Sequence, residues 1–385
     1  MVLKGDDWGL SEDSLALRLE ARRFAEEEII PVASKFDESA DFPGEIISKA
    51  HKLGLINLTV PAELGGTGLS VYDTCLVIEE IAAGCGGFAT SIVANDLALT
   101  PIMVGGSDEQ KKTFLGDIAA SGGLASFCLT EPGAGSDAAG LSTTARRDGD
   151  SYIISGSKQW ITNAGFASQF TVFATMDKSK GHKGICCFVV PREALGITVG
   201  HHENKMGQRC SNTARVTFDD VRVPIGNRIG EEGEGFSIAM KTLDASRPMT
   251  AMIAVGIARS AFYYAVKYSK ERKQFGQPIS SFQAIQTILA DMATDIECAR
   301  LITMRSAEML GAGERASLYS SMAKRFAADM AMKVTTDAVQ VYGGYGYTKE
   351  YPVEKLMRDA KLMQIYEGTS QIQRVVIAKE LLKEI

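Results

Sequence analysis

A glutamate between an aromatic residue and a glycine is the strongest chemical signal in the chain. Glu367 lies in the segment IYEGTS, directly before a stretch that the pattern predicts to be helical. In an apolar site the pKa of such a carboxyl group rises, which suits a base that removes a weakly acidic C–H proton. A glutamate at the start of a helix capped by Thr369 or Ser370 is the alternative. The residues alone leave both interpretations open.

Asp96 is a second carboxylate in an unusual setting. It is the sole charged residue between positions 81 and 107. On a helix it would lie near Val93 and Leu97, and hence near any cavity lined by that face. We interpret Asp96 as a buried, hydrogen-bonded structural carboxylate. A substrate contact or a second acid/base is the alternative role.

Three glycine-containing or aromatic segments could hold a ligand. TEPGAGSD (130–137) would let backbone N–H groups approach an anionic or planar ligand, although an ordinary turn has the same composition. It matches neither a Walker loop nor GxGxxG. In KQWITN (158–163), Trp160 could stack on a flat ring, but packing in a core is the more common role of tryptophan. QVYGG (340–344) is expected to end a helix, since glycine is typical there.

Composition limits the protein class. The 385 residues suffice for two or three domains, and a net charge of −6 argues against a nucleic-acid binder. Seven cysteines without CxxC spacing indicate reduced, packed thiols, and four histidines build no zinc motif, so no metal is expected. We expect no secretory signal and no membrane insertion, because glycine and proline interrupt the apolar run at 81–107. These features favour a bacterial-type cytoplasmic protein, with a mature mitochondrial matrix form as the alternative.

The hydrophobic periodicity changes twice along the chain. Residues 1–123 follow a helical pattern that begins at the capping residue Ser11. Residues 124–235 contain short β-branched and aromatic runs between turn signals, which predicts a barrel or sandwich. Residues 236–385 return to helical stripes, such as Met322, Phe326, Met330 and Val334, that are typical of an antiparallel bundle with a packed core.

Taken together and in order, six segments resemble the acyl-CoA dehydrogenase family over essentially the whole chain. They are LTEPGAGSD (129–137), KQWITNAG (158–165), MGQRCSNT (206–213), ERKQFGQPI (271–279), QVYGGYGY (340–347) and RDAKLMQIYEGTSQIQR (358–374). The short- to medium-chain, straight-chain branch is the most similar. The resemblance implies an N-terminal helical domain, a middle β-barrel and a C-terminal four-helix bundle, assembled as a homotetramer.

The resemblance also implies FAD, bound between the β-domain and the bundle and partly across a subunit interface. A guanidinium such as that of Arg272 can grip a pyrophosphate through two hydrogen bonds. The implied cofactor residues are Phe127, Cys128, Leu129, Thr130, Ser136, Trp160, Ile161, Thr162, Arg272, Gln274, Phe275, Gln283, Gln340, Val341, Gly343, Gly344, Thr369 and Gln371.

By the same resemblance, Glu367 is the base that removes the α-proton of an acyl-CoA thioester while the β-hydrogen leaves as hydride to flavin N5. Some branches carry the base where this chain has Ser246, which cannot do that job. Lys379 stands where relatives often have arginine. The implied substrate residues are Thr90, Val93, Ala94, Asp96, Leu97, Ser136, Asp244, Ser246, Arg247, Tyr366, Gly368 and Lys379.

Several functional alternatives stay open. Straight-chain C4–C8 acyl groups are preferred over an alicyclic or modified acyl-CoA with Asp96 as an additional acid/base. No arginine occurs at 81–107, so a substrate with a distal carboxylate has no obvious partner there. Electron-transfer flavoprotein is the implied acceptor, and an oxidase shares most of these residues. A catalytically silent flavin- or CoA-ester-binding homologue is disfavoured by Glu367, and a DNA-associated relative by the acidic balance.

Overall fold

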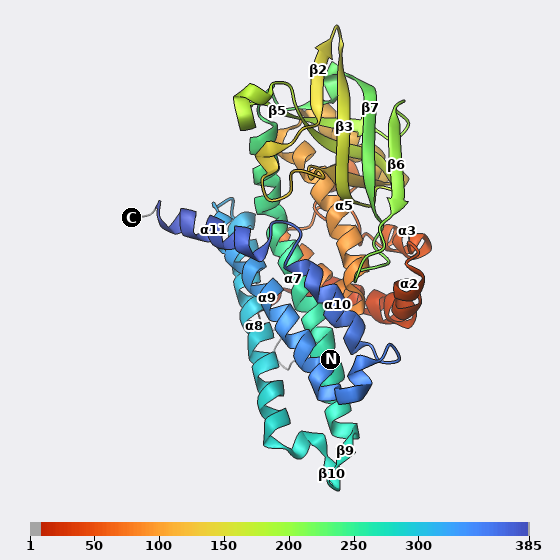
Figure 1. Cartoon of the computed structure of the whole chain (residues 1–385), viewed down its shortest axis with the longest axis vertical. Helices are drawn as coiled ribbons and strands as arrows, with labels where there is room; N and C mark the ends of the chain where they lie inside the picture. The colour runs from red at the N-terminus through yellow and green to blue at the C-terminus, as the bar shows by residue number, and fades with distance from the viewer. Residues whose placement is uncertain (1–8, 384–385) are drawn as a thin grey trace.

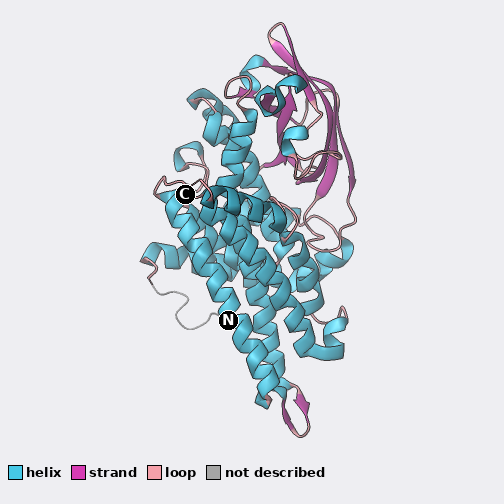
Figure 2. Cartoon of the chain, turned by 60° about the vertical axis from the view of Figure 1, so that its left-hand side comes forward, coloured by secondary structure: helices cyan, strands magenta, loops and turns pink. Residues whose placement is uncertain are grey.

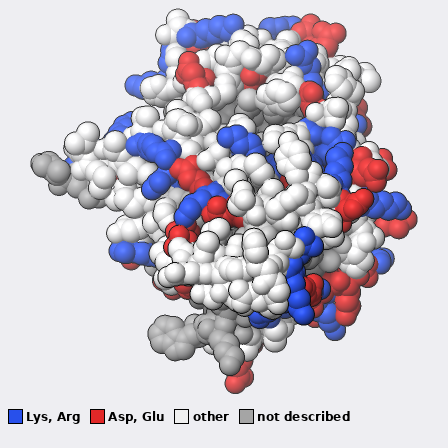
Figure 3. Space-filling view, turned by 60° about the horizontal axis from the view of Figure 1, so that its bottom comes forward, with Lys and Arg blue, Asp and Glu red and all other residues white. Residues whose placement is uncertain are grey.

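The computed structural model describes residues 9–383, in which a β-sheet region lies between two helical regions in sequence. In space the large sheet forms one end of an elongated molecule (Figure 1), and the long helices run away from it to a small strand pair at the other end (Figure 2). On the face shown in Figure 3, acidic and basic side chains are interspersed with neutral ones. The helical, β, helical order confirms the predicted fold class.

The N-terminal region begins with a capped helix, as the sequence predicts. The hydroxyl of Ser11 accepts a hydrogen bond from the backbone N–H of Ser14. The helices are α1 Glu12–Phe24, α2 Ala33–Ser39, α3 Gly44–Lys52, α4 Val71–Gly84, α5 Gly86–Gly105 and α6 Asp108–Ser121. Shorter turns are the π-helix Ala25–Ile29 and the 3-10 turns Ile30–Val32 and Ala62–Leu64.

One expectation about the apolar run at 81–107 is wrong. Pro101 does not interrupt it, because α5 continues through Pro101 to Gly105 with most of its residues buried, whereas Gly84 and Gly86 do flank the break between α4 and α5. By length and composition α5 and α7 (Gly235–Glu271) could each cross a membrane, but 83% and 78% of their apolar windows are buried inside the fold. Because α5 packs against other elements on all sides, it tolerates the loss of the backbone N–H donor at Pro101.

The middle region is an eight-stranded sheet. Its strand order is β6-β7-β3-β2-β4-β5-β8, with β1 paired to β4. Strands β2 and β4 share a single residue pair, so the described strands form two halves rather than a closed hydrogen-bonded barrel. Tyr152 and Phe188, from opposite halves, pack with ring centroids 5.0 Å apart in a common core. The strands are β1 Leu124–Cys128, β2 Thr144–Asp148, β3 Ser151–Thr162, β4 Ala167–Thr175, β5 Ile185–Pro191, β6 Ile197–His202, β7 Thr213–Pro224 and β8 Arg228–Ile229.

The C-terminal region is a helical bundle whose breaks fall where the glycines predict them. Its core includes Met292, Met330 and Val334, so the methionine stripes pack in the interior as expected. A hairpin that the sequence pattern does not reveal joins the first two long helices. The elements are α7 Gly235–Glu271, β9 Lys273–Gln274, β10 Gln277–Pro278, α8 Gln283–Gly311, α9 Ser317–Tyr342, α10 Val353–Met363 and α11 Ser370–Leu381.

A buried ionic cluster ties the two helical regions together. Glu79 and Glu80 of α4 are almost fully buried. Arg300 of α8 reaches Glu79 at 2.6 Å, and Arg259 of α7 reaches Glu80 at 2.5 Å. Although burial alone would raise it, Arg300 and Arg259 lower the pKa of Glu79 to about 2. Both carboxylates are therefore ionised at neutral pH and fix α4 against the bundle.

Candidate active site

The three regions meet around a cavity of about 340 Å³. One wall is α5, the second is the end of β1 with the loop after it and the end of β3, and the third is the first half of α7. The segment between α10 and α11 and the start of α11 close the cavity. The lining residues are Thr90, Val93, Ala94, Leu97, Phe127, Leu129, Thr130, Gly135, Ser136, Asp137, Ala138, Ala139, Trp160, Ile161, Thr162, Phe236, Met240, Leu243, Arg247, Thr250, Ile253, Tyr366, Glu367, Gly368, Ile372 and Val376.

Glu367 lies on this cavity, as the sequence predicts. One carboxylate oxygen, Oε2, accepts a hydrogen bond of 3.1 Å from the hydroxyl of Ser246. Burial raises the pKa of Glu367, while Ser246 and the charges of Lys324 and Arg247 oppose the rise. Thr369 caps α11 by accepting from the backbone N–H of Ile372. Glu367 therefore precedes the cap, and its carboxylate takes no part in capping α11.

The turn that carries Glu367 has an unusual backbone. Glu367 has a φ of +56° and Gly368 a φ of +85°, so two consecutive residues adopt the left-handed conformation. A Cβ on Gly368 would lie 2.6 Å from Nε2 of Gln373, so any other residue would have to displace that side chain. A non-glycine residue in this conformation costs free energy and persists only where its surroundings fix it.

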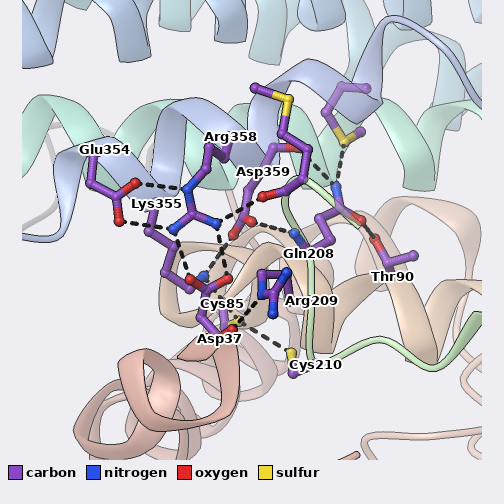
Figure 4. Close-up of polar contacts among 12 residues, drawn as sticks. Asp37, Cys85, Thr90, Gln208, Arg209, Cys210, Glu354, Lys355, Arg358 and Asp359 are labelled. Atoms are coloured by element: carbon purple, nitrogen blue, oxygen red, sulfur yellow. Dashed lines mark hydrogen bonds and ion pairs between the residues drawn. The ribbon is translucent and has the colours of Figure 1, made fainter. Parts of the chain in front are cut away.

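A hydrogen-bonded chain that starts at Thr90 supports the α5 wall of the cavity (Figure 4). The hydroxyl of Thr90 donates to Oε1 of Gln208 at 2.7 Å and lies 3.1 Å from the hydroxyl of Tyr366. Gln208 is fully buried, and its side chain also donates to the carbonyl of Asp359 at 3.1 Å and to Sδ of Met363 at 3.4 Å. The hydroxyl of Tyr366 also lies 3.1 Å from Sδ of Met363, so its single proton has two acceptors within reach, Thr90 and Met363.

The chain extends to a buried cluster of charged and thiol groups (Figure 4). A carboxylate oxygen of Asp359 accepts from Lys355 Nζ at 2.6 Å, and Lys355 lies 3.4 Å from Sγ of Cys85. The sulfur atoms of Cys85 and Cys210 are 3.7 Å apart. The hydrogen bond from Cys210, aided by Lys355 and opposed by burial, lowers the pKa of Cys85 to about 6.

A buried ion pair anchors the glycine-rich loop at 130–137. Lys158 is fully buried and donates to Oε1 of Glu131 at 2.8 Å. Glu131 also accepts from the backbone N–H groups of Ser142 and Thr143 at 2.6 and 2.9 Å. Although burial alone would raise it, Lys158 and these bonds lower the pKa of Glu131 to about 2. Glu131 of the loop and Lys158 of β3 therefore fix the loop that lines the cavity.

Trp160 does not pack in a core, the more common of the two roles that the residues alone left open. It is 60% exposed, has a φ of +62° and lines the cavity, so a flat ligand can reach its ring. The register of β3 against β7 shifts between Lys158 and Ile161, which explains how the ring leaves the sheet. Cys128 is fully buried in the sheet core and does not line the cavity. Its side chain therefore offers a ligand no contact there.

Asp96 is buried, as we expected, and its side chain is not among the cavity-lining groups. Oδ1 accepts from the backbone N–H and the hydroxyl of Thr59 at 2.9 and 2.8 Å. Oδ2 has no hydrogen-bond partner among the described residues. Burial raises the pKa of Asp96.

Other predicted substrate residues lie at the rim or beyond it. Arg247 lines the cavity and pairs with Asp244, whose Oδ2 accepts from Ser317 at 2.5 Å. The predicted substrate residue Lys379 and the predicted cofactor residue Gln371 are exposed on α11, outside the cavity lining.

A second groove, of about 560 Å³, lies at the far end of the bundle. It brings together Arg272, Gln274, Val341, Gly343 and Gly344 of the predicted cofactor residues. Phe275, in the β9–β10 turn beside it, is 93% exposed. Gln283 and Gln340 are exposed nearby in sequence. The other residues of the groove are Tyr268, Ile279, Tyr342, Tyr345 and Thr348.

Sequence reasoning missed the α7 wall and the supports behind the site. Phe236, Met240, Leu243 and Thr250 share one helical face with the predicted Arg247, at spacings of four and three, so they could have been recognised. Ile372 and Val376 likewise lie one turn apart on α11. Gln208 and Lys324 have no comparable signal, because only the tertiary structure brings them to the site.

Comparison with known proteins decides the family. Residues 11–122, 126–221 and 233–382 match the N-terminal, middle and C-terminal domains of acyl-CoA dehydrogenase. The chain belongs to the acyl-CoA dehydrogenase family. Members of this family are FAD-dependent oxidoreductases that act on CH–CH bonds, so this acyl-CoA dehydrogenase is an enzyme of that class.

Relatives of similar sequence are named for different acyl-CoA substrates. The chain is 44% identical to a probable medium-chain specific acyl-CoA dehydrogenase of Caenorhabditis briggsae, named as mitochondrial, over 98% of this chain and 92% of the relative. It is 46% identical to cyclohexane-1-carbonyl-CoA dehydrogenase of Geobacter metallireducens, over 94% and 96%. The solved structure of butyryl-CoA dehydrogenase from Megasphaera elsdenii superposes with a TM-score of 0.95 at 41% identity, covering 98% of this chain and 100% of that one.

Proposed function

We propose that this acyl-CoA dehydrogenase converts an acyl-CoA thioester to its trans-2-enoyl-CoA, with Glu367 as the base that removes the α-proton. The observation that carries the proposal is the position of Glu367 on an enclosed, largely apolar cavity, where burial raises its pKa. A carboxylate with a raised pKa is a stronger base, and a thioester α-proton is only weakly acidic. Hydrogen bonds to the thioester carbonyl, including one from the backbone N–H of Glu367, would stabilise the developing enolate.

The residues fit FAD. Trp160 presents an exposed ring to the cavity, while Thr130, Ser136 and Thr162 add hydroxyl groups there. A Cβ on Gly135 would meet no atom within 4 Å, so the loop leaves space for a bound group. We infer that these residues hold the flavin ring, which when bound accepts the β-hydrogen as hydride.

The adenine dinucleotide part would require a second subunit. The groove with Arg272 and Gly343 lies beyond Tyr268, and about 27 Å of α7 separates Tyr268 from Thr250 in the cavity wall, at about 1.5 Å per residue. We therefore infer that the groove of one subunit, with Gln274, Phe275, Gln283 and Gln340, completes the cofactor site of a neighbour in a homotetramer. Thr369 and Gln371 would complete the same site from the start of α11.

The acyl pocket suits an uncharged acyl chain. Val93, Ala94 and Leu97 of α5 face Met240 and Leu243 of α7 across the cavity. We propose straight-chain C4–C8 acyl groups as substrates, with Arg247 binding the CoA part. An alicyclic acyl group is the second candidate, because a relative of 46% identity is named for cyclohexane-1-carbonyl-CoA. Electron-transfer flavoprotein is the proposed electron acceptor.

An anaerobic absorbance titration with butyryl-, hexanoyl-, octanoyl- and cyclohexanecarbonyl-CoA tests the proposal. We expect a yellow protein whose flavin absorbance is bleached most by one of the straight-chain thioesters. The matched variant Glu367→Gln should retain the yellow colour and bind acyl-CoA but lose flavin reduction by about 10³-fold or more. Reduction at the wild-type rate would refute the assignment of the base. Comparing re-oxidation by electron-transfer flavoprotein and by oxygen separates a dehydrogenase from an oxidase.

A further inference from the structure

The turn that carries Glu367 is held from the side opposite the cavity. Lys324 of α9 is 1% exposed, and its Nζ donates to the backbone carbonyl of Gly368 at 2.7 Å. Gln373 of α11 is fully buried, and its Nε2 donates to the carbonyls of Glu367 and Gly368 at 3.0 and 3.3 Å. Neither Lys324 nor Gln373 lines the cavity. Both residues therefore contact the turn from behind, and the side of the turn that lines the cavity carries Glu367.

These donors act on a backbone that needs support. Glu367 and Gly368 have φ values of +56° and +85°. A backbone of this kind relaxes unless several contacts fix it. Because carbonyl oxygens only accept hydrogen bonds, the Gln373 amide must present its NH₂ group to them. The two carbonyls of the turn are thus both satisfied by side chains from helices outside it.

The other charged groups that act on Lys324, Arg247 and Asp329, each have an ion-pair partner of their own. Arg247 is paired with Asp244. Asp329, one turn along α9, accepts from Arg374 at 2.7 Å as well as from Ser370 and Gln364.

We propose that Lys324 and Gln373 are positioning residues for the base: both fix the direction of the Glu367 carboxylate through the turn, and the ammonium group of Lys324 also keeps that carboxylate ionised. The proposal rests on the function proposed above. It adds a specific electrostatic role for a buried lysine that does not touch the substrate. Burial lowers the pKa of Lys324 to about 8, with Glu367 opposing and Arg247 assisting the fall, so Lys324 is charged at neutral pH.

The sign of the expected effect follows from this arrangement. A positive charge near Glu367 favours its ionised form, so removing that charge raises the pKa of Glu367 further. At a given pH a smaller fraction of the enzyme then has an ionised base. Among the described residues, Arg247 and Tyr366 are the other charged or titratable groups that interact with Glu367, and the substitutions leave both in place.

The test is the pH dependence of kcat and kcat/KM, measured for the FAD-loaded enzyme with its best acyl-CoA. Lys324→Gln keeps a donor for Gly368 but removes the charge, so we expect the acid limb of kcat/KM to move up by about one to two pH units. Gln373→Leu removes a donor but no charge. It should lower kcat about tenfold, with little change in KM and no movement of the acid limb. Lys324→Arg keeps the charge and should keep the wild-type limb.

Lys333→Met is the matched control. Lys333 is on the same helix, its side chain is 53% exposed, and it pairs with Asp295 rather than with the site. Flavin content and thermal unfolding identify any variant that misfolds. If Lys324→Gln misfolds, Lys324→Arg and Gln373→Leu decide the outcome. A wild-type acid limb in Lys324→Gln, a shifted limb in Lys324→Arg, or unchanged kcat in Gln373→Leu would overturn the inference. A wild-type flavin that no acyl-CoA reduces would instead refute the proposed function.

Discussion

The ion pair beneath the glycine-rich loop allows a prediction whose size follows from the structure. Lys158→Met keeps the length of the side chain and removes the ammonium group that contacts Glu131 at 2.8 Å and the carbonyl of Leu129 at 3.1 Å. The substitution leaves the Glu131 carboxylate buried beneath the cavity wall, with only its bonds to Ser142 and Thr143. We expect the middle region to lose stability and the loop to hold the flavin less tightly.

The pKa of Glu131 sets the magnitude. A fall from 4.5 to about 2 amounts to roughly 3 kcal/mol of folded-state stability, at about 1.4 kcal/mol per pH unit. The bonds from Ser142 and Thr143 account for part of this. Burial also lowers the pKa of Lys158, so desolvation of the lysine offsets a further part. The expected loss in Lys158→Met at pH 7 is therefore about 2 kcal/mol.

The pH dependence gives the prediction a second check. Because the folded pKa of Glu131 lies below the unfolded value, its contribution is present above about pH 4.5 and is lost as the pH falls toward 2. Lys158→Met should flatten this part of the curve when denaturant unfolding is followed from pH 7 to pH 3. Arg222→Met is the control, because it breaks an ion pair with Asp148 in which both side chains are exposed to solvent. Equal, small effects of the two substitutions, with unchanged flavin content, would refute the reasoning.

Three further outcomes follow from buried groups. Burial raises the pKa of Asp96, so its ionisation at neutral pH costs stability, and Asp96→Asn should raise Tm at pH 8 but not at pH 4. Turnover of straight-chain and alicyclic acyl-CoA should stay unchanged, and an altered substrate preference would instead favour the acid/base role. Glu79→Gln should cost about 3 kcal/mol at pH 7 and little near pH 2, measured by denaturant unfolding, because the pKa of Glu79 is about 2. Gly256→Ala would place a Cβ 2.5 Å from the carbonyl oxygen of Glu79 and should lower Tm, although alanine favours a helix, since α4 and α7 would have to separate.

The fold could be read from local patterns because those patterns repeat. The helical stripe that includes Met330 and Val334 packs in the core, and the runs at Tyr152 and Phe170 lie in strands. The prediction that Pro101 interrupts the apolar run was wrong. Because α5 is buried on every side, its apolar residues lie on all faces and show no hydrophobic periodicity. The short β9–β10 hairpin was missed since each strand has two residues.

The site was predictable where a residue type is unusual and unpredictable where a contact is long-range. Glu367 stands out between Tyr366 and Gly368 in the sequence itself. Trp160 could not be placed from composition, because a register shift in β3 decides whether the ring points into the core. Gln208 contacts Thr90 from 118 positions away, and no local pattern reports such a pair.

The contacts behind the proposed base affect how substitutions act. A side chain on a regular helix takes its direction from the helix, whereas Glu367 lies on a two-residue left-handed turn. Its direction then depends on Lys324 and Gln373 behind the turn, while Ser246 contacts the carboxylate. Each of these residues makes one or two hydrogen bonds to the turn or the carboxylate. Removing one such side chain therefore lowers the free energy of unfolding by only about 1–2 kcal/mol. A displacement of the base by a fraction of an ångström costs far more in rate than in stability. We therefore expect substitutions at these positions to lower turnover in proteins that remain folded and yellow.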